Sequence, residues 1–127
     1  MNTPPTFSIY VLKLVTDWMI EMGGIEYFEE KSVSQSSRLY KQLESYKDFL
    51  NLPVCDYSKS RSNIIFKFKN NDLEKKFLNE AGEKGILGLN GHRSEGGIRI
   101  SLYNSITDEM VDYLSEFIEQ FFANNGR

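Results

Sequence analysis

The chain has little of the chemistry on which many small proteins rely: its 127 residues include one cysteine, one histidine and one tryptophan. The single cysteine, Cys55, excludes a disulfide within the chain and a zinc site built from cysteines. One histidine and carboxylates scattered along the sequence provide no metal-ligand set. A nucleophile-elbow motif is also absent, although a serine or cysteine site whose partners meet only in space stays open.

A long hydrophobic run is missing too. The longest apolar segment, residues 9–22, contains Lys13, Asp17 and Glu21. It therefore falls short of the roughly 20 apolar residues that a membrane span requires. The N-terminus has no signal-like stretch, so we expect a soluble, cytoplasmic protein in a reducing compartment.

An excess of positive charge is lacking as well. Lysine and arginine total 15 against 18 acidic residues, a formal net charge of −3, which argues against a surface coated with nucleic acid. The content of 40% hydrophobic and 13% aromatic residues is enough, at this length, for one core without disulfides or metals. We expect a single domain over residues 1–127, with an N-terminal arm over residues 1–7.

Hydrophobic periodicity predicts helices and strands in a definite order. Two helical patterns are separated by a glycine pair, and the later strands alternate apolar and polar residues. The expected elements are helices over 8–22 and 25–46, a loop with at most a short strand over 49–52, a strand over 63–69, a helix from Asn71-Asp72 to Gly85, strands over 86–89 and 98–103, and a last helix capped by Thr107. This order predicts an α+β fold, a small and mostly antiparallel sheet covered by helices.

The ends of the later helices carry capping signals. Asn71 and Glu74 have capping-box spacing, and Thr107 precedes two acidic residues in a first helical turn. In the last helix, one stripe is expected to face the core: Met110, Val111, Leu114, Phe117, Ile118 and Phe121.

A glycine-rich loop over residues 91–97 holds the only histidine, His92, beside Arg93. Backbone N–H groups, a guanidinium and an imidazole together suit the oxygens of a phosphate. This favours an anion pocket. The alternative is a plain connection between two strands with a solvated His-Arg pair.

Arg99 alternates with the apolar residues of the strand that follows. It is expected on the face opposite Ile98, Ile100 and Leu102, which are expected to face the core. A guanidinium on a rigid strand can clamp a carboxylate with two hydrogen bonds. The alternative is a solvent-exposed strand face.

Two segments carry a resemblance to a known family. Residues 2–10 (NTPPTFSIY) and 91–104 (GHRSEGGIRISLYN) look like two signature stretches of the phosphoserine aminotransferase family, class V pyridoxal-phosphate enzymes of serine biosynthesis. Their order and separation match, and residues 63–68 and 73–78 resemble the same region. The similarity covers nearly the whole chain, but only the C-terminal part of that family's polypeptide.

The resemblance implies a fold, an activity and roles for individual residues. The fold would be that of the C-terminal domain of a fold-type I aminotransferase, and the complete homodimeric enzyme would exchange an amino group between phosphoserine and 2-oxoglutarate with pyridoxal 5'-phosphate. Asn2 and Thr3 would contact the cofactor phosphate across the dimer interface. His92 and Arg93 would help bind the substrate phosphate, and Arg99 would hold its α-carboxylate.

The chain differs from the family pattern in two places and lacks the family's large domain. Glu95 stands where a small apolar residue is usual, and Asn90 replaces a common lysine. Because the lysine that carries the cofactor belongs to the large domain, we expect this chain alone to be inactive and to bind no cofactor. One alternative is a free-standing, non-catalytic module that binds small anions or a protein. A weaker one is nucleic-acid binding through the lysines and arginine of residues 59–76.

Overall fold

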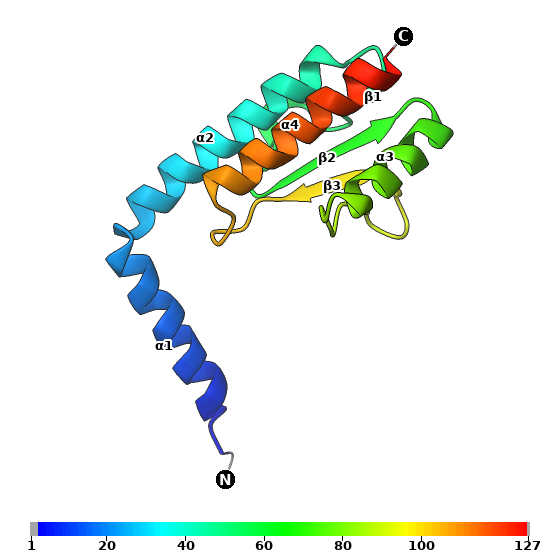
Figure 1. Ribbon diagram of the computed structural model, residues 1–127. Coiled ribbons are helices and arrows are strands. Elements are labelled where there is room, and N and C mark those ends of the chain that lie inside the picture. Colours follow the sequence, from blue (N-terminus) through cyan, green and yellow to red (C-terminus); the bar gives the residue numbers. More distant parts are fainter. Residues whose placement is uncertain (1–2, 127) are drawn as a thin grey trace. The chain divides into compact units, whose positions relative to one another are not determined.

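The computed structural model in Figure 1 describes residues 3–126. The chain divides into two compact units, Met1–Lys31 and Ser32–Arg127. The elements in chain order are α1 Thr6–Glu21, α2 Gly24–Ser45, β1 Leu50–Asn51, the 3-10 turn η1 Asp56–Ser58, β2 Asn63–Phe68, α3 Asn71–Glu83, β3 Ile98–Ser101 and α4 Asp108–Asn125. The α+β class is therefore confirmed, whereas the single domain over residues 1–127 stays a prediction.

The first unit consists of α1 and the start of α2. No residue of α1 is buried, and its apolar side chains are largely open to solvent, among them Phe7, Ile9, Tyr10, Leu12 and Ile20. This helix therefore leaves apolar surface exposed. At its end Gly23 and Gly24 have φ of 114° and 74°, values that glycine adopts without steric cost.

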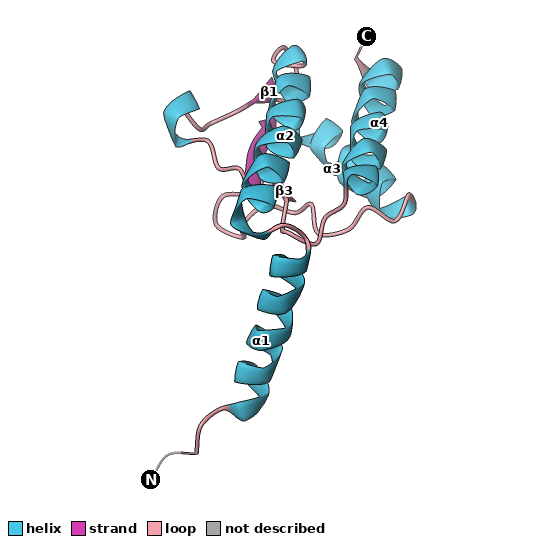
Figure 2. Ribbon diagram, turned by 90° about the vertical axis from the view of Figure 1, so that its left-hand side faces the viewer, coloured by secondary structure: helices cyan, strands magenta, loops and turns pink. Residues whose placement is uncertain are grey.

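The second unit contains a three-stranded antiparallel sheet in the order β1-β2-β3 (Figures 1 and 2). Burial alternates along β2 and β3, as the period-2 pattern requires. One face is buried and carries Ile64, Phe66, Phe68, Ile98 and Ile100. The register pairs Ile65 with Arg99 and Asn63 with Ser101 on the other face, so the sheet presents a mixed polar surface there.

Phenylalanine rings fill the space between the buried face of the sheet and the helices. Phe77 of α3 is fully buried, and its ring centroid lies 5.0 Å from those of both Phe117 and Phe121 of α4. It also lies 5.2 Å from the ring of Phe68 in β2. Helices α3 and α4 therefore share one core with the strands, and these three rings meet Phe77 in tilted or edge-on geometry.

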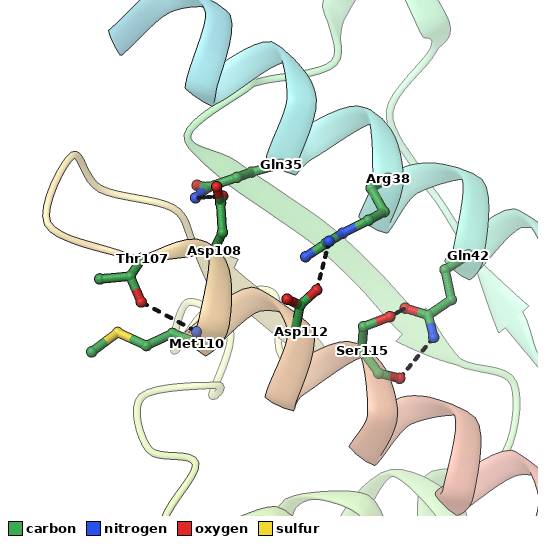
Figure 3. A network of polar contacts seen from close by, with 8 residues as sticks. All are labelled: Gln35, Arg38, Gln42, Thr107, Asp108, Met110, Asp112 and Ser115. Carbon is green, nitrogen blue, oxygen red and sulfur yellow. Dashed lines mark hydrogen bonds and ion pairs between the residues drawn. The ribbon is translucent and has the colours of Figure 1, made fainter. Parts of the chain in front are cut away.

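A ladder of polar contacts joins α2 and α4 (Figure 3). Gln35 donates to Oδ1 of Asp108 at 2.7 Å, and Arg38 forms an ion pair with Asp112 at 2.6 Å. Gln42 and Ser115 exchange two hydrogen bonds of 2.8 and 2.9 Å. Because residue numbers rise together on both helices, the two run parallel. These six residues are called the polar ladder below.

The helix starts follow the capping signals, with one shift. Thr107 caps α4 as expected, since its Oγ1 accepts from the backbone N–H of Met110. The cap of α3 is Asn70 rather than Asn71, because Oδ1 of Asn70 accepts from the N–H groups of Asp72 and Leu73. Glu74 consequently reaches back to the N–H of Phe68.

Two expectations about the core and the strands are wrong. Residues 86–89 form no strand: Gly88 adopts φ of 79°, which breaks an extended run, and Leu87 is 80% exposed. Along α4, Met110 is exposed while Phe122 is buried. The inward stripe is thus rotated slightly, and it ends on Phe122, which stacks on Tyr46 at 4.1 Å.

Candidate functional site

The candidate site lies on the open face of the sheet in the second unit. Arg99 projects from β3 and has Ile65 of β2 as its direct cross-strand neighbour. Lys67, two residues further along β2, shares this face because alternate side chains of a strand point to one side. The predicted position of Arg99, away from the buried Ile98 and Ile100, is confirmed by the burial pattern of β3.

A tight loop over residues 91–97 borders this face. The N–H of Gly91 donates to the carbonyl of Gly97 at 2.8 Å, and the carbonyl of His92 accepts from the N–H groups of Glu95 and Gly96. A Cβ on Gly97, whose φ is 74°, would lie 2.8 Å from the Cγ atom of Lys67 and 2.9 Å from the carbonyl of Phe66. Glycine is required there because the loop lies directly against β2.

The loop and the strands enclose a cavity of about 270 Å³. Its lining combines an apolar floor with a few polar and charged side chains, a common composition for a small-molecule site. The lining residues are Pro53, Val54, Ile65, Lys67, Gly91, His92, Glu95, Gly96 and Arg99. This cavity is called the loop cavity below, and two of the predicted site residues, His92 and Arg99, line it.

The guanidinium of Arg99 has unused hydrogen-bonding capacity. Its Nε is buried and has no hydrogen-bond partner among the described residues. Buried polar atoms in folded proteins are nearly always paired, and an arginine presents five N–H donors in a fixed fork. Arg99 also lines the loop cavity, and a carboxylate matches the fork of a guanidinium with two parallel bonds.

His92 is held by its own loop. Its Nδ1 lies 2.9 Å from Oγ of Ser94 and accepts from the backbone N–H of Ser94 at 3.3 Å. One ring nitrogen is thus engaged inside the turn.

Lys67 and Glu95 face each other at the edge of the loop cavity. Nζ of Lys67 is 3.8 Å from Oε2 of Glu95, and both side chains retain solvent exposure. The carboxylate that departs from the family pattern therefore has a lysine as partner. This arrangement partly compensates the repulsion that a lone carboxylate would exert on a bound anion.

A second cavity of about 420 Å³ adjoins the first, and Arg99 lines both. Its walls are mostly apolar and come from residues 86–89, the end of β3 and the start of α4. Tyr103 lines this larger cavity together with Arg99. Arg99 thus stands between an apolar cavity and one with charged side chains.

One further predicted site residue belongs to the glycine-rich loop but does not line the loop cavity. Arg93 is exposed and is not among the residues that line it. Thr3 is an exposed residue of the first unit. Asn2 lies outside the described residues. The roles proposed for all three remain predictions.

Residue-by-residue reasoning missed the contribution of β2 and of the segment before it. Ile65 and Lys67 lie within the strand predicted over residues 63–69, but no local pattern connects that strand with the glycine-rich loop. Pro53 and Val54 lie between the predicted elements and carry no signal for a site. The signal that finds them is the pairing register between β2 and β3, which is a long-range property of the sheet.

The basic residues of segment 59–76 are largely offset by acidic neighbours. The ion pairs are Lys59 with Glu44 and Asp56, Lys67 with Glu95, Lys75 with Asp72, and Lys76 with Glu80. Such pairing weakens the positive field on which non-specific nucleic-acid binding depends.

Neither a membrane span nor a metal centre is visible in the part of the chain that the structure describes. None of its helices combines the length and the hydrophobicity needed to cross a bilayer. Over the same residues, no group of three or more metal-ligating side chains converges.

With this geometry in place, comparison with known proteins defines the class. Residues 1–114 match the family model described as aminotransferase class-V. The chain belongs to this family, which confirms the resemblance drawn from the two signature segments.

The individual relatives narrow the comparison to one enzyme. The chain is 39% identical over 124 residues to the phosphoserine aminotransferase of Halalkalibacterium halodurans and 37% identical over 126 residues to a probable phosphoserine aminotransferase of Dictyostelium discoideum. Each alignment covers 98% of this chain and 34% of the relative. The chain therefore spans about a third of the length of these relatives.

Solved structures of the same enzyme share the fold. The phosphoserine aminotransferase of Bacillus circulans subsp. alkalophilus superposes with a TM-score of 0.93 at 35% identity, over 98% of this chain and 34% of that one. A pyridoxal-phosphate-bound phosphoserine aminotransferase from Trichomonas vaginalis gives a TM-score of 0.85 at 31% identity, over 93% and 34%. The predicted architecture is thus confirmed.

Proposed function

We propose that this chain is the C-terminal part of a phosphoserine aminotransferase and recognises the substrate of that enzyme. The complete enzyme would exchange an amino group between phosphoserine and 2-oxoglutarate in serine biosynthesis. The observation that carries the proposal is the lining of the loop cavity. It includes His92 and an Arg99 whose buried Nε has no partner among the described residues, in a chain whose relatives bear that enzyme's name.

Phosphoserine has an anionic group at each end, and the site has a cation or donor for each. Arg99 would hold the α-carboxylate with its two-pronged fork, as the geometry of a guanidinium favours. His92, which also lines the loop cavity, would donate to the phosphate. Arg93, exposed beside it in the loop, would add a second positive charge there.

The chain would also contribute to the cofactor site. The amide of Asn2 and the hydroxyl of Thr3 are donors that suit the phosphate of pyridoxal 5'-phosphate, and Thr3 is exposed and so available to it. These residues would act across the interface of a homodimer. When bound, the cofactor supplies the electron sink of the reaction, while the protein binds and orients the substrate.

The other parts of the proposal follow from the same family. The partners would be small molecules, with neither nucleic acid nor a membrane surface among them, and the enzyme would act in the cytoplasm. Because the lysine that carries the cofactor belongs to the family's large domain, this chain alone would bind no cofactor and catalyse no transamination.

A chimera tests the proposal directly. This chain would replace the matching C-terminal third of the Halalkalibacterium halodurans enzyme, to which it is 39% identical. We expect the purified chimera to transaminate phosphoserine with 2-oxoglutarate, whereas the isolated chain shows no activity. A folded chimera that binds the cofactor but does not turn over phosphoserine would contradict the proposal.

The same material separates the rival function. A free-standing anion-binding module would bind inorganic phosphate and phosphoserine alike, because only the phosphate is recognised. The proposed enzyme part would discriminate between phosphoserine and O-phosphoethanolamine, which lacks the α-carboxylate that Arg99 is proposed to hold. Equal binding of these two compounds to the isolated chain would favour the module.

A further inference from the structure

The turn that follows His92 fixes more than the position of the ring. His92 is the only histidine of the chain, and its carbonyl accepts from the N–H groups of Glu95 and Gly96, at 3.0 and 2.8 Å. The same turn brings Ser94 next to the imidazole of His92. Two atoms of Ser94 contact Nδ1 of the ring, Oγ at 2.9 Å and the backbone nitrogen at 3.3 Å.

The two contacts differ in what they require of the imidazole. The hydroxyl of Ser94 can either donate or accept, but a backbone N–H can only donate. For the second contact to be a hydrogen bond, Nδ1 must carry a lone pair and no proton. In the neutral ring the proton then sits on Nε2, because one nitrogen is a donor whenever the other is an acceptor.

This assignment decides what His92 offers to a ligand. Nδ1 is engaged within the loop, so Nε2 is the nitrogen left for the loop cavity, which His92 lines. An Nε2 that carries the proton is a hydrogen-bond donor even when the ring is uncharged. A phosphate oxygen needs a donor, and the opposite tautomer would present a lone pair to it instead.

We propose that Ser94 is a positioning residue, which holds His92 as the Nε2–H tautomer and so keeps a donor directed at a phosphate at neutral pH. The inference rests on the proposed function for its ligand, the phosphate group, but the tautomer itself does not depend on that function. Ser94 touches neither substrate nor cofactor in this scheme and acts only through the imidazole.

The single histidine makes the tautomer directly observable. In the chain labelled with ¹⁵N-histidine, a long-range ¹H–¹⁵N spectrum at about pH 8, where an ordinary imidazole is neutral, reports only on His92. We expect one set of signals with the proton on Nε2. A peptide that covers residues 89–98, in which the turn is not closed by the sheet, serves as the reference and is expected to show a mixture of tautomers.

Three variants separate positioning from general loop structure. Ser94→Pro removes the hydroxyl and the backbone N–H that donates to Nδ1, so we expect it to raise the share of the Nδ1–H tautomer and to weaken binding of inorganic phosphate about two- to tenfold, the range expected for loss of one neutral hydrogen bond. Ser94→Ala keeps that N–H and should cause a smaller shift in the same direction, whereas Ser105→Ala, at an exposed turn residue outside the loop cavity, should change neither quantity. A wild-type spectrum equal to that of the peptide, or a Ser94→Pro spectrum equal to wild type, would overturn the proposal.

The experiment also distinguishes failure of this inference from failure of the proposed function. If the tautomer is as expected but neither phosphate nor phosphoserine shifts the Nε2 signal, the positioning role for ligand binding is refuted together with the proposed phosphate role of His92. If both ligands shift the signal while the tautomer is mixed, the proposed phosphate role of His92 stands and only the role of Ser94 is refuted.

Discussion

Replacing Arg99 by lysine tests the part of the site with the clearest geometry. The buried Nε of Arg99 has no hydrogen-bond partner among the described residues, and Arg99 lines the loop cavity. In the proposed complex, a carboxylate accepts two charge-assisted hydrogen bonds from the guanidinium fork. Lysine keeps the positive charge but supplies a point donor that cannot reproduce the fork.

The expected magnitude follows from the loss of one such bond. A hydrogen bond to a charged group contributes about 1.5–3 kcal/mol, and about 1.4 kcal/mol corresponds to a tenfold change. Arg99→Lys should therefore lower kcat/KM for phosphoserine in the chimera by about 10- to 150-fold. The loss should be much smaller for binding of inorganic phosphate, which is proposed to contact the other end of the site.

The assay needs a control in which the same chemical change is made elsewhere. Arg38 is suitable because it pairs with Asp112 in the polar ladder and does not line the loop cavity. Arg38→Lys should leave kcat/KM within about twofold, since partly exposed ion pairs contribute little. A change of less than about threefold for Arg99→Lys, or an equal loss in both variants, would remove Arg99 from the carboxylate site.

Three further predictions concern the core, the edge of the cavity and the acid side of the stability profile. Phe77→Ala should lower the free energy of unfolding by about 3–5 kcal/mol in urea denaturation, because Phe77 is fully buried among other rings. Glu95→Gln should tighten phosphate binding by about two- to fivefold in a calorimetric titration, an effect that fades at high salt, because it frees Lys67. Lys59 lowers the pKa of Asp56, so the stability that this carboxylate contributes is present above the pKa of unfolded aspartate. It is lost as the pH falls through the lowered folded value, and Lys59→Met should flatten that part of a urea-midpoint profile.

Each of these predictions has a control within the chain. Phe7→Ala removes an equal side chain that is 79% exposed and should leave the unfolding free energy nearly unchanged. Lys67→Met should weaken phosphate binding, which separates loss of the cation from loss of the carboxylate. Lys59→Arg keeps the charge and should retain the acid-side slope. Tighter phosphate binding in Lys67→Met than in wild type would show that the ion pair has been misinterpreted.

The parts of the molecule that were predictable are those set by local periodicity. Alternation alone placed Arg99 opposite Ile98 and Ile100, and the buried pattern of β3 bears this out. The N-cap at Thr107 was likewise predictable from the sequence, since a cap involves only the first turn of the helix. The strand predicted over residues 86–89 is absent, because a short apolar run lacks a period that distinguishes a strand from other structure. The positive φ of Gly88, which interrupts the run, depends on the surrounding fold.

The cavity itself was not predictable, because it is created by contacts between distant segments. The loop cavity joins Pro53, Lys67 and His92, and only the strand register and the closure of the glycine-rich loop bring these residues together. The same holds for the pairing of Glu95 with Lys67. From the sequence alone Glu95 is an unfavourable charge beside an anion site, whereas in the fold it has a counter-ion.

The polar ladder has a consequence for how α2 and α4 are aligned. Two apolar helix faces can slide past each other by one turn at modest cost in free energy, because hydrophobic contacts are not directional. If α4 slipped by one turn, Gln35 would face Asp112. The buried side-chain amide of Gln35, which donates to the carbonyl of Ile106 at 3.3 Å, would lose that acceptor. Each rung would meet the wrong partner, and unpaired buried polar groups are costly. The polar ladder therefore fixes the axial register of α2 and α4, since only one alignment of the two helices pairs all of its residues.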